Sequence, residues 1–263
     1  MRISNYESMT EATNPPRDPR LSPLFEEDAD VVARHCIDLV TIVFEDPELE
    51  LEMIDLLQRN IDQKEGFSTG EFCIALILGE IRSTSSTTVI LQCLHAEEDE
   101  MIQQIAVRSL QRIGGPAFDA ILELLEDPEV NGEAAAMAIG SLEGISLHEL
   151  PQHKENIIER LRIDLVNSKL PIQRREAAAI ALARLGISEV AETIELLLER
   201  EFQNGNVFIS EALELMSEYP DGTPGHTEDP IEQVVRWISD DILPGGEFDL
   251  SMIKKEESDP EQI

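Results

Sequence analysis

The sequence predicts an all-α fold, an α-α superhelix or solenoid of about six helix pairs. Apolar stretches of helical length alternate with short breaks rich in Gly, Pro and Asp along most of the 263 residues. One short phrase recurs at the ends of these stretches. No run alternates apolar and polar residues with the period of two that strands require, so a sheet is not expected. Aromatic residues make up only 4%, which favours a core of aliphatic side chains between closely packed helices.

Two polar ends flank the expected helical array. Residues 1–28 are rich in Pro and charge and lack an apolar stripe, so we expect a disordered or loosely packed N-terminal tail. Residues 29–244 contain the helix-length stretches and form the predicted α-solenoid. Residues 245–263 begin with two glycines and end in acidic residues, so we expect an acidic C-terminal tail.

Capping residues and prolines mark the first helices of this array. Asp30 can cap a helix that ends near residue 44, and Asp46 followed by Pro47 predicts a second helix that ends near residue 60. Gly114-Gly115-Pro116 is a strong helix stop. Further helices are therefore expected over residues 69–82, 87–94, 98–113 and 117–126.

Later stretches carry an apolar stripe on one face. Val190, Ile194, Leu197 and Leu198 stand at i, i+4, i+7 and i+8 of one stretch. The same pattern recurs over residues 157–165. Residues 146–154 separate two copies of the pattern and are expected to form a loop insertion.

The last helix pair is expected over residues 206–243, with a long loop inside it. Trp237 shares helical spacing with Val234 and Ile238, and it is the only Trp of the chain. Because a Trp ring usually buries most of its surface, we expect Trp237 to seal the end of the core.

The recurring phrase places an aliphatic anchor near the end of every other helix. Its copies are Leu78-Gly79-Glu80-Ile81, Leu110-Gln111-Arg112-Ile113-Gly114, Ile139-Gly140-Ser141-Leu142, Leu182-Ala183-Arg184-Leu185-Gly186 and, more weakly, Leu213-Glu214-Leu215-Met216. Most copies lie about 30 residues apart, which is the period of a helical repeat. Ala106, Ala135 and Ala178 stand four residues before three of the anchors, where small side chains let helices approach closely. The copies with Arg82 or Glu143 in place of the closing Gly predict a differently built turn.

This pattern resembles that of HEAT repeats, in particular the short bacterial kind also found in phycobilin lyases. Residues 173–186 carry the clearest copy, and the resemblance covers roughly residues 30–243. It implies a right-handed superhelix in which the second helix of each pair lines the concave face. A shared repeat architecture specifies no activity, so function has to be argued from the surface.

Charge is the strongest compositional feature of the chain. Its 54 acidic and 20 basic residues give a net charge of -34 at pH 7. A surface this negative disfavours nucleic acid and anionic membranes as partners, and it attracts a basic protein. Acidic faces also serve solubility alone, so the charge by itself leaves both interpretations open.

The expected function is that of a non-enzymatic protein-binding scaffold or adaptor. An acidic concave groove would hold a basic partner segment by electrostatic encounter and extended contact. The candidate interaction residues, placed on the second helices of the pairs, are Glu52, Asp55, Glu123, Glu159, Glu195 and Glu199. Two alternatives remain: a cofactor-attachment enzyme of the phycobilin-lyase type, and an acidic DNA mimic that inhibits a nucleic-acid-binding protein.

No catalytic residue, metal ligand or cofactor is predicted. His148-Glu149 followed by His153 suggests a metal motif, but a helix-borne zinc site needs a His where Gln152 stands. Cys36, Cys73 and Cys93 form no C-x-x-C pair and have no base and orienting group at nucleophile spacing. Their odd number favours a reducing compartment, so a cytoplasmic location is expected. No apolar run reaches the ~18 residues of a membrane span.

A small group of cations stands out in the otherwise acidic chain. Arg160, Arg162, Arg174 and Arg175 lie between acidic neighbours in the sequence. Salt bridges along helices are the expected role, and a local contact patch is the alternative.

Overall fold

The described part of the chain folds into helices joined by short turns. The computed structural model describes residues 15–64, 66–96, 99–148, 153–201 and 205–223, without the side chains of 146–148, and these residues contain no strand. The α-helices are α1 (Ala29–Glu45), α2 (Pro47–Gln63), α3 (Thr69–Glu80), α4 (Thr87–Cys93), α5 (Glu100–Ile113), α6 (Gly115–Glu126), α7 (Gly132–His148), α8 (Lys154–Val166), α9 (Ile172–Arg184), α10 (Ala191–Arg200) and α11 (Val207–Glu218). Short 3-10 helices are η1 (Pro19–Phe25), η2 (Thr84–Ser86) and η4 (Ser188–Val190). The all-α prediction is confirmed for these residues.

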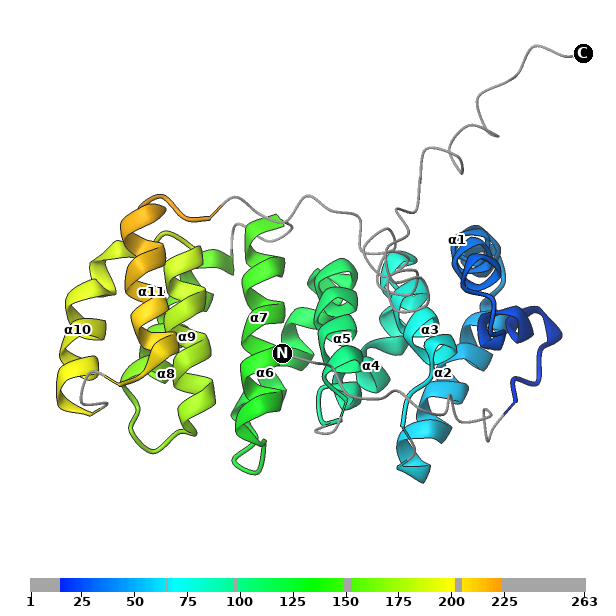
Figure 1. Cartoon of the computed structure of the whole chain (residues 1–263), viewed down its shortest axis with the longest axis horizontal. Helices are drawn as coiled ribbons and strands as arrows, with labels where there is room; N and C mark the ends of the chain where they lie inside the picture. The colour runs from blue at the N-terminus through cyan, green and yellow to red at the C-terminus, as the bar shows by residue number, and fades with distance from the viewer. Residues whose placement is uncertain (1–14, 65, 97–98, 149–152, 202–204, 224–263) are drawn as a thin grey trace, which may run out of the picture.

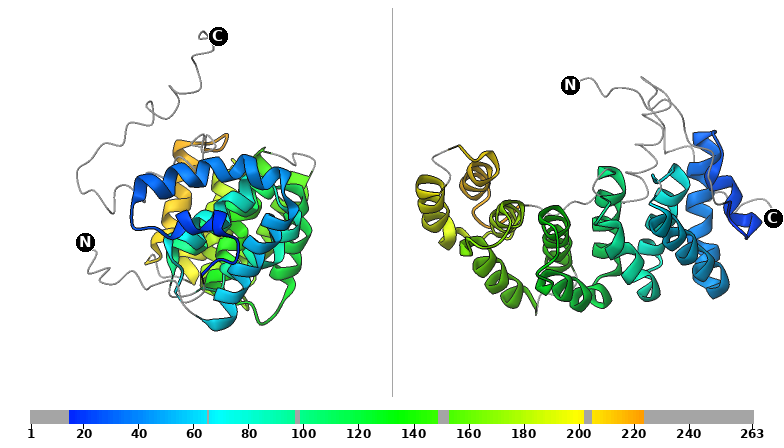
Figure 2. Two further views of the ribbon diagram at one scale, coloured as in Figure 1. Left: turned by 90° about the vertical axis from the view of Figure 1, so that its right-hand side faces the viewer. Right: turned by 90° about the horizontal axis from the view of Figure 1, so that it is seen from below.

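The helices lie in two layers that bend into an arc. Odd-numbered helices from α3 to α11 stand side by side in one layer, and the even-numbered helices lie behind them (Figure 1). Consecutive odd-numbered helices pack against each other far more extensively than consecutive even-numbered ones. A closely spaced layer takes the inside of a curve, and Figure 2 shows the odd-numbered helices on the inner side. We call these the inner layer and the outer layer.

Side-chain caps explain where several helices begin. Asp46 accepts hydrogen bonds from the backbone N–H groups of Glu48 and Leu49, at 3.1 and 3.2 Å, and Pro47 is the first residue of α2, as predicted. At α1 the cap is Asp28 and not the predicted Asp30, because Asp28 accepts from the N–H groups of the first turn. The helix consequently begins two residues before the predicted start.

The ends of α3 and α9 share one turn geometry. After α9, Gly186 takes a φ of 75° and the N–H of Ile187 donates to Leu182 O at 3.0 Å. After α3, Arg82 takes a φ of 54° and the N–H of Ser83 donates to Leu78 O, also at 3.0 Å. The expectation of a different turn at Arg82 is therefore wrong. Arg82 adopts the left-handed conformation itself, at a cost of about 1 kcal/mol relative to Gly.

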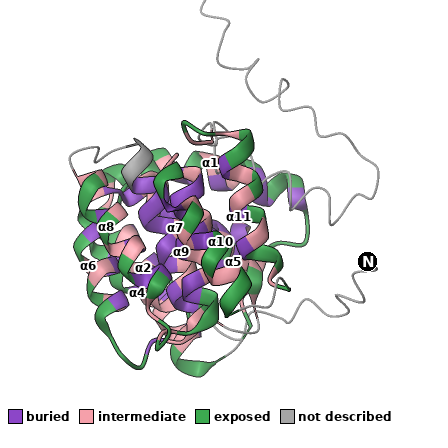
Figure 3. Ribbon diagram, turned by 90° about the vertical axis from the view of Figure 1, so that its left-hand side faces the viewer, coloured by how far each residue is buried: buried purple, intermediate pink, exposed green. Residues whose placement is uncertain are grey.

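The core lies between the two layers, and the recurring phrase supplies much of it (Figure 3). The anchors Leu78, Leu110, Ile139 and Leu182 and the alanines Ala106, Ala135 and Ala178 are fully buried. Gly79 is required by packing, because a Cβ there would stand 2.7 Å from the Cα of Ser109 on α5. The Ser109 hydroxyl donates to Ala75 O at 2.8 Å, which joins α5 to α3. Small residues thus set the close spacing of the inner layer.

The N-terminal expectation needs a correction between residues 19 and 25. This segment was expected in a loose tail, yet it forms η1, whose Leu21 and Leu24 are completely buried against α1 and α3. Arg20 ties the segment to the start of α2 through an ion pair with Asp46 at 2.8 Å. The polar composition concealed two leucines at helical spacing, which are enough to cover the exposed edge of α1.

Several predictions fall on residues outside the described part. These are the first 14 residues of the expected N-terminal tail, Trp237 as a seal of the core, and the acidic tail over residues 245–263. Among the described residues, no helix has both the length and the apolar character needed to cross a membrane.

Candidate functional site

The six predicted interaction residues all lie on the outer layer. Glu52 and Asp55 are on α2, Glu123 on α6 and Glu159 on α8, and the remaining two lie on α10. Their expected place on the concave side is a mistake, because the inner layer consists of the Ala-containing helices that carry the recurring phrase. The expected pairing is also not what the packing favours, because most inner helices pack more extensively against the outer helix that precedes them than against the one that follows.

Two of these six carboxylates are engaged by arginines of the chain. Arg59 on α2 donates from Nε to Asp55 at 3.0 Å and from Nη2 to Glu52 at 3.2 Å. Arg17 adds an ion pair with Asp55 at 3.2 Å, and its backbone N–H donates to Glu52 at 2.9 Å. These contacts hold the N-terminal segment on α2, so Glu52 and Asp55 have a structural role.

The other four carboxylates are exposed on the outer layer. Glu123, Glu159, Glu195 and Glu199 project from α6, α8 and α10 into solvent. Further exposed acidic residues lie on the same helices or the turns beside them, namely Asp119, Glu126, Asp127, Glu129, Glu155, Glu189 and Glu192. Carboxylates at this density repel one another in dilute salt, and a cationic ligand would relieve that repulsion. We call Glu123, Glu159, Glu195 and Glu199 the outer acidic surface.

The inner layer carries charges in ordered pairs across neighbouring helices. Arg112 on α5 makes a bidentate ion pair with Glu80 on α3, with N–O distances of 2.7 and 2.6 Å. Arg184 on α9 bonds to Glu143 on α7 at 3.4 Å. The first ion pair links α3 to α5 and the second links α7 to α9, so both join neighbouring helices of the inner layer.

Burial makes Glu143 an unusual carboxylate. Desolvation raises its pKa above the ordinary value, and the nearby charges of Arg184 and Arg108 offset only part of this effect. At the start of α5, Asp99 also has a raised pKa because of desolvation, although its carboxylate accepts the N–H of Ile102 at 3.2 Å. Glu143 bonds to Arg184 across the contact between α7 and α9, and Asp99 caps α5, so both carboxylates have partners within the fold.

Two of the four clustered arginines are buried structural groups. Arg174 bonds to Asp164 at 2.8 Å, and it also donates to the carbonyl of Leu125 at the end of α6 at 2.7 Å. Arg160 donates to the same carbonyl at 3.0 Å. Arg175 is buried as well and donates to Leu165 O at 3.0 Å, at the end of α8. These guanidinium groups satisfy the last carbonyls of outer helices, so the contact-patch alternative is wrong for Arg174 and Arg175.

The cysteines lie in the core and are poorly suited to nucleophilic chemistry. Cys36, Cys73 and Cys93 are free thiols that are almost completely buried. Contact with Cys36 and burial raise the pKa of Cys73 well above its ordinary value. Burial raises the pKa of Cys93 to about 12. Since the thiolate is the reactive form, these groups act as small core residues.

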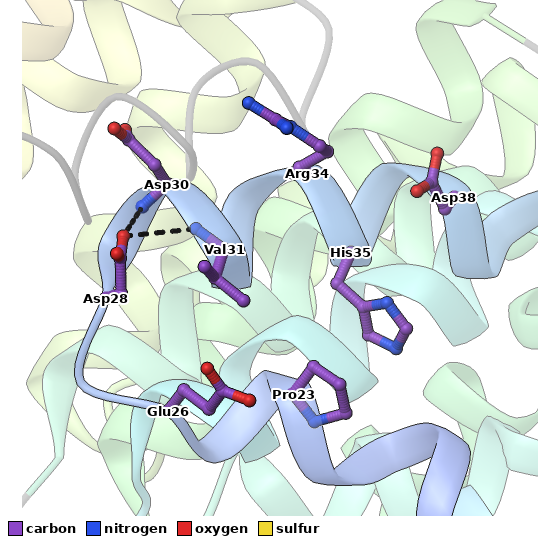
Figure 4. A pocket seen from close by; sticks show the side chains of 8 residues that line it. All are labelled: Pro23, Glu26, Asp28, Asp30, Val31, Arg34, His35 and Asp38. Carbon is purple, nitrogen blue, oxygen red and sulfur yellow. Dashed lines mark hydrogen bonds between the residues drawn. The ribbon is translucent and has the colours of Figure 1, made fainter.

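A shallow hollow lies between η1 and the first half of α1 (Figure 4). Figure 4 shows His35 directed toward η1, whereas Asp30 and Arg34 point away from it. The His35 ring nitrogen Nε2 lies 2.5 Å from Arg20 O, and the Asp28 carboxylate caps α1. His35 and Asp28 are thus engaged within the fold, while Asp30 and Arg34 point away from the hollow. These side chains do not converge on one position that a ligand could occupy.

The predicted absence of a metal motif stays a prediction, since the side chains of residues 148 and 149 lie outside the described part. Within that part, no three His, Cys, Asp or Glu side chains are grouped as metal ligands would be. His153 instead packs against Phe118, with ring centroids 4.8 Å apart.

No protein-family model, no curated protein and no solved structure matches this chain.

Proposed function

We propose that this chain is a HEAT-type helical solenoid that serves as a non-enzymatic scaffold and binds a basic segment of another protein. The observation that carries the proposal is the outer acidic surface, on which four exposed carboxylates from three consecutive outer helices accompany a net charge of -34. An elongated array offers a partner many weak contacts, and its negative field speeds the encounter with a cation. A cytoplasmic location belongs to the same proposal, because three free buried thiols suit a reducing compartment.

A charge-matched pair of variants tests the site. In the first variant, Glu123, Glu159, Glu195 and Glu199 are all changed to Gln. In the second, four exposed acids of the inner layer, Glu100, Glu133, Glu211 and Glu214, are changed to Gln. Both variants lose the same formal charge, so they separate a local surface from the general field of the molecule.

The measurement is fluorescence anisotropy of a labelled oligolysine peptide at several salt concentrations. We expect wild-type binding to weaken as salt rises, and the first variant to bind at least about tenfold more weakly than the second. Equal binding by the two variants would show that the outer acidic surface is not a site. Binding that does not respond to salt would contradict an electrostatic mechanism.

The two alternatives predict different results in separate assays. A phycobilin-lyase-type enzyme would form a covalent coloured product from a bilin and an acceptor protein. A DNA mimic would lose its partner when duplex DNA competes for the same basic surface. Neither alternative is favoured by a contact among the described residues, and both stay predictions.

A further inference from the structure

The inner helices α5, α7 and α9 leave one face open. Each of them is packed on both sides by inner helices and from behind by outer helices, so its remaining side faces the inside of the arc (Figure 2). The middle of this open face consists of half-buried aliphatic or small residues, which on α7 and α9 lie three or four positions apart. We call this band the inner strip, formed by Val107, Ala136, Met137, Gly140, Ala177 and Ile180.

Small residues keep the centre of the inner strip low. A Cβ built on Gly140 would meet no atom closer than Val107 Cγ1 at 3.9 Å, so space remains above the α7 backbone. Ala136 lies one turn before Gly140, and Ala177 lies on the neighbouring α9. Because these side chains are short, the apolar stripe of another chain can approach α7 closely.

The two edges of the inner strip are the opposite ends of parallel helices. Arg112, in the last turn of α5, bonds to Glu80 at the end of α3, so the C-terminal ends of these inner helices lie together. At the opposite ends, Asn206 before α11 donates to Glu176 in the first half of α9, at 2.5 Å. The inner helices therefore run in one direction, and their N-terminal ends lie along one edge of the strip.

The edge at the N-terminal ends is acidic. Glu100 is the first residue of α5 and Glu133 the second residue of α7, and both are exposed. Glu100 precedes Val107 by seven positions and Glu133 precedes Gly140 by seven, so both carboxylates share the open face with the inner strip. We call Glu100 and Glu133 the acidic edge.

The edge at the C-terminal ends presents arginines. The Arg112 side chain is 43% exposed, whereas that of its partner Glu80 is only 9% exposed. The Arg184 side chain is also 43% exposed, against 12% for Glu143. Since the carboxylates are the more buried partners, a ligand that approaches this edge meets guanidinium N–H donors first. We call Arg112 and Arg184 the basic edge.

We infer that the inner strip binds an amphipathic helix of another protein whose two flanks carry opposite charges. A helix that lies across α5, α7 and α9 presents an apolar stripe to the inner strip and one flank to each edge, whereas an extended strand directs its side chains to only two sides. Its basic flank meets the acidic edge, and its acidic flank meets the basic edge. Two helix spacings separate α5 from α9, about 20 Å, which a helix of about 14 residues covers. This site is separate from the outer acidic surface, so the inference does not depend on the proposed function.

Two labelled peptides of identical composition test the charge pattern against the full-length protein. Both are helices of about 18 residues with the same stripe of Leu and Ala and equal numbers of Lys and Glu. The segregated peptide carries all Lys on one flank and all Glu on the other, and the mixed peptide carries both on each flank. Neither has a net charge, so the overall negative field of the protein favours neither. We expect fluorescence anisotropy in about 0.15 M NaCl to show that the segregated peptide binds at least about tenfold more tightly.

Two double variants with the same change of net charge locate the site. The inner double variant combines Glu100→Lys with Glu133→Lys, which makes both edges basic, so the advantage of the segregated peptide should disappear. The outer double variant combines Glu123→Lys with Glu159→Lys and should leave that advantage unchanged. All four positions are exposed, and far-UV circular dichroism with urea unfolding checks that both variants fold.

A substitution at the centre of the inner strip tests its shape. Gly140→Leu fills the space above α7 and should weaken binding of the segregated peptide at least about tenfold. Gly66→Leu, between α2 and α3 where a Cβ meets no atom within 4 Å, is the control and should not change binding. Equal effects of these two substitutions would overturn the inference.

The peptide results can contradict the inference in three further ways. Wild-type protein that binds the two peptides equally, or binds neither, would show that the inner strip does not select a helix with oppositely charged flanks. An advantage of the segregated peptide that survives in the inner double variant would place its site elsewhere. So would an advantage that disappears in the outer double variant.

Discussion

At the scale of single residues, charged groups in this protein do structural tasks that their sequence context does not reveal. Asp164 and Arg174 are both almost fully buried, and their ion pair closes the end of α6, whose Leu125 carbonyl lies 49 residues from Arg174 in the chain. A buried charge pair is stable only when its remaining hydrogen-bonding groups are satisfied. Here the backbone carbonyl of Leu125, which has no partner within α6, accepts the remaining hydrogen bond of Arg174. The packing of α9 against the end of α6 therefore determines that Arg174 is buried.

Glu143 gives a pH-dependent prediction at this scale. Its pKa in the folded protein is raised above the ordinary 4.5 by desolvation, so the folded state binds the proton more tightly than the unfolded state does. Its contribution to stability is therefore fully present below pH 4.5 and is lost as the pH rises through the raised value. A Gln at this position keeps hydrogen-bonding capacity toward Arg184 without the buried charge.

We expect Glu143→Gln to be more stable than wild type at neutral pH, by on the order of 1 kcal/mol. The advantage should shrink as the pH falls toward 4.5, where the wild-type carboxyl is protonated. Urea unfolding of both proteins across this range measures the difference. The exposed Glu123→Gln serves as the control, and a difference that stays constant with pH at Glu143 would contradict the assigned cause.

At the scale of the helices, small residues set the spacing of the inner layer. Gly79 and Gly140 stand next to an anchor in equivalent copies of the recurring phrase, yet their surroundings differ. A Cβ at Gly79 would clash with the Ser109 backbone at 2.7 Å, whereas at Gly140 the nearest atom is 3.9 Å away. The two glycines therefore have different physical reasons to be there, although the sequence pattern treats them alike.

This difference predicts opposite effects for one substitution. Gly79→Ala should destabilise the protein by about 1–3 kcal/mol, because α3 and α5 have to separate. Gly140→Ala should stabilise it by about 0.5–1 kcal/mol, because Ala loses less backbone entropy in a helix. Urea unfolding free energies of the two variants make the comparison. Equal effects at the two positions would mean that contact with Ser109 does not govern the α3–α5 spacing.

The helices and the repeat phrase could be predicted from sequence because their signals are local. Asp46-Pro47 and Gly114 act within a few residues of a helix end, and the anchor Leu182 belongs to a stripe on its own helix. Which helix of a pair lies inside the arc depends on contacts between repeats. Ala135 and Ala178 carry a part of that signal, since small residues mark the closely spaced layer, but their local pattern does not indicate which side of the arc that layer takes.

The candidate surface was predictable only in part, for the same reason. The exposure of Glu123 and Glu195 follows from their own helix faces. Arg59 engages Glu52 and Asp55 within α2, but their further contact with Arg17 joins residues 35 or more positions apart, in a segment expected to be loose. Long-range pairing of this kind leaves no periodic signal in one sequence.

At the scale of the whole molecule, the net charge of -34 acts against folding. Bringing the acids of α6, α8 and α10 onto one layer raises their mutual repulsion relative to an extended chain. The ion pairs Arg112–Glu80 and Arg184–Glu143 of the inner layer oppose this effect. Each acts over a short range, and in both the carboxylate is largely buried. Repulsion summed over many exposed carboxylates acts over about 30 Å at low salt, and it is largely screened at about 0.5 M.

We therefore expect salt to stabilise this protein. Raising NaCl from about 10 mM to about 0.5 M should raise the Tm by several degrees, roughly 3–8 °C for a gain of about 1–2 kcal/mol. Calorimetry at pH 7 measures the shift, and the variant with four Gln on the outer acidic surface should show a smaller one. A Tm that falls with salt would mean that pairs such as Arg112–Glu80 and Arg184–Glu143 outweigh the repulsion. The acidic surface would then not dominate the electrostatics of the fold.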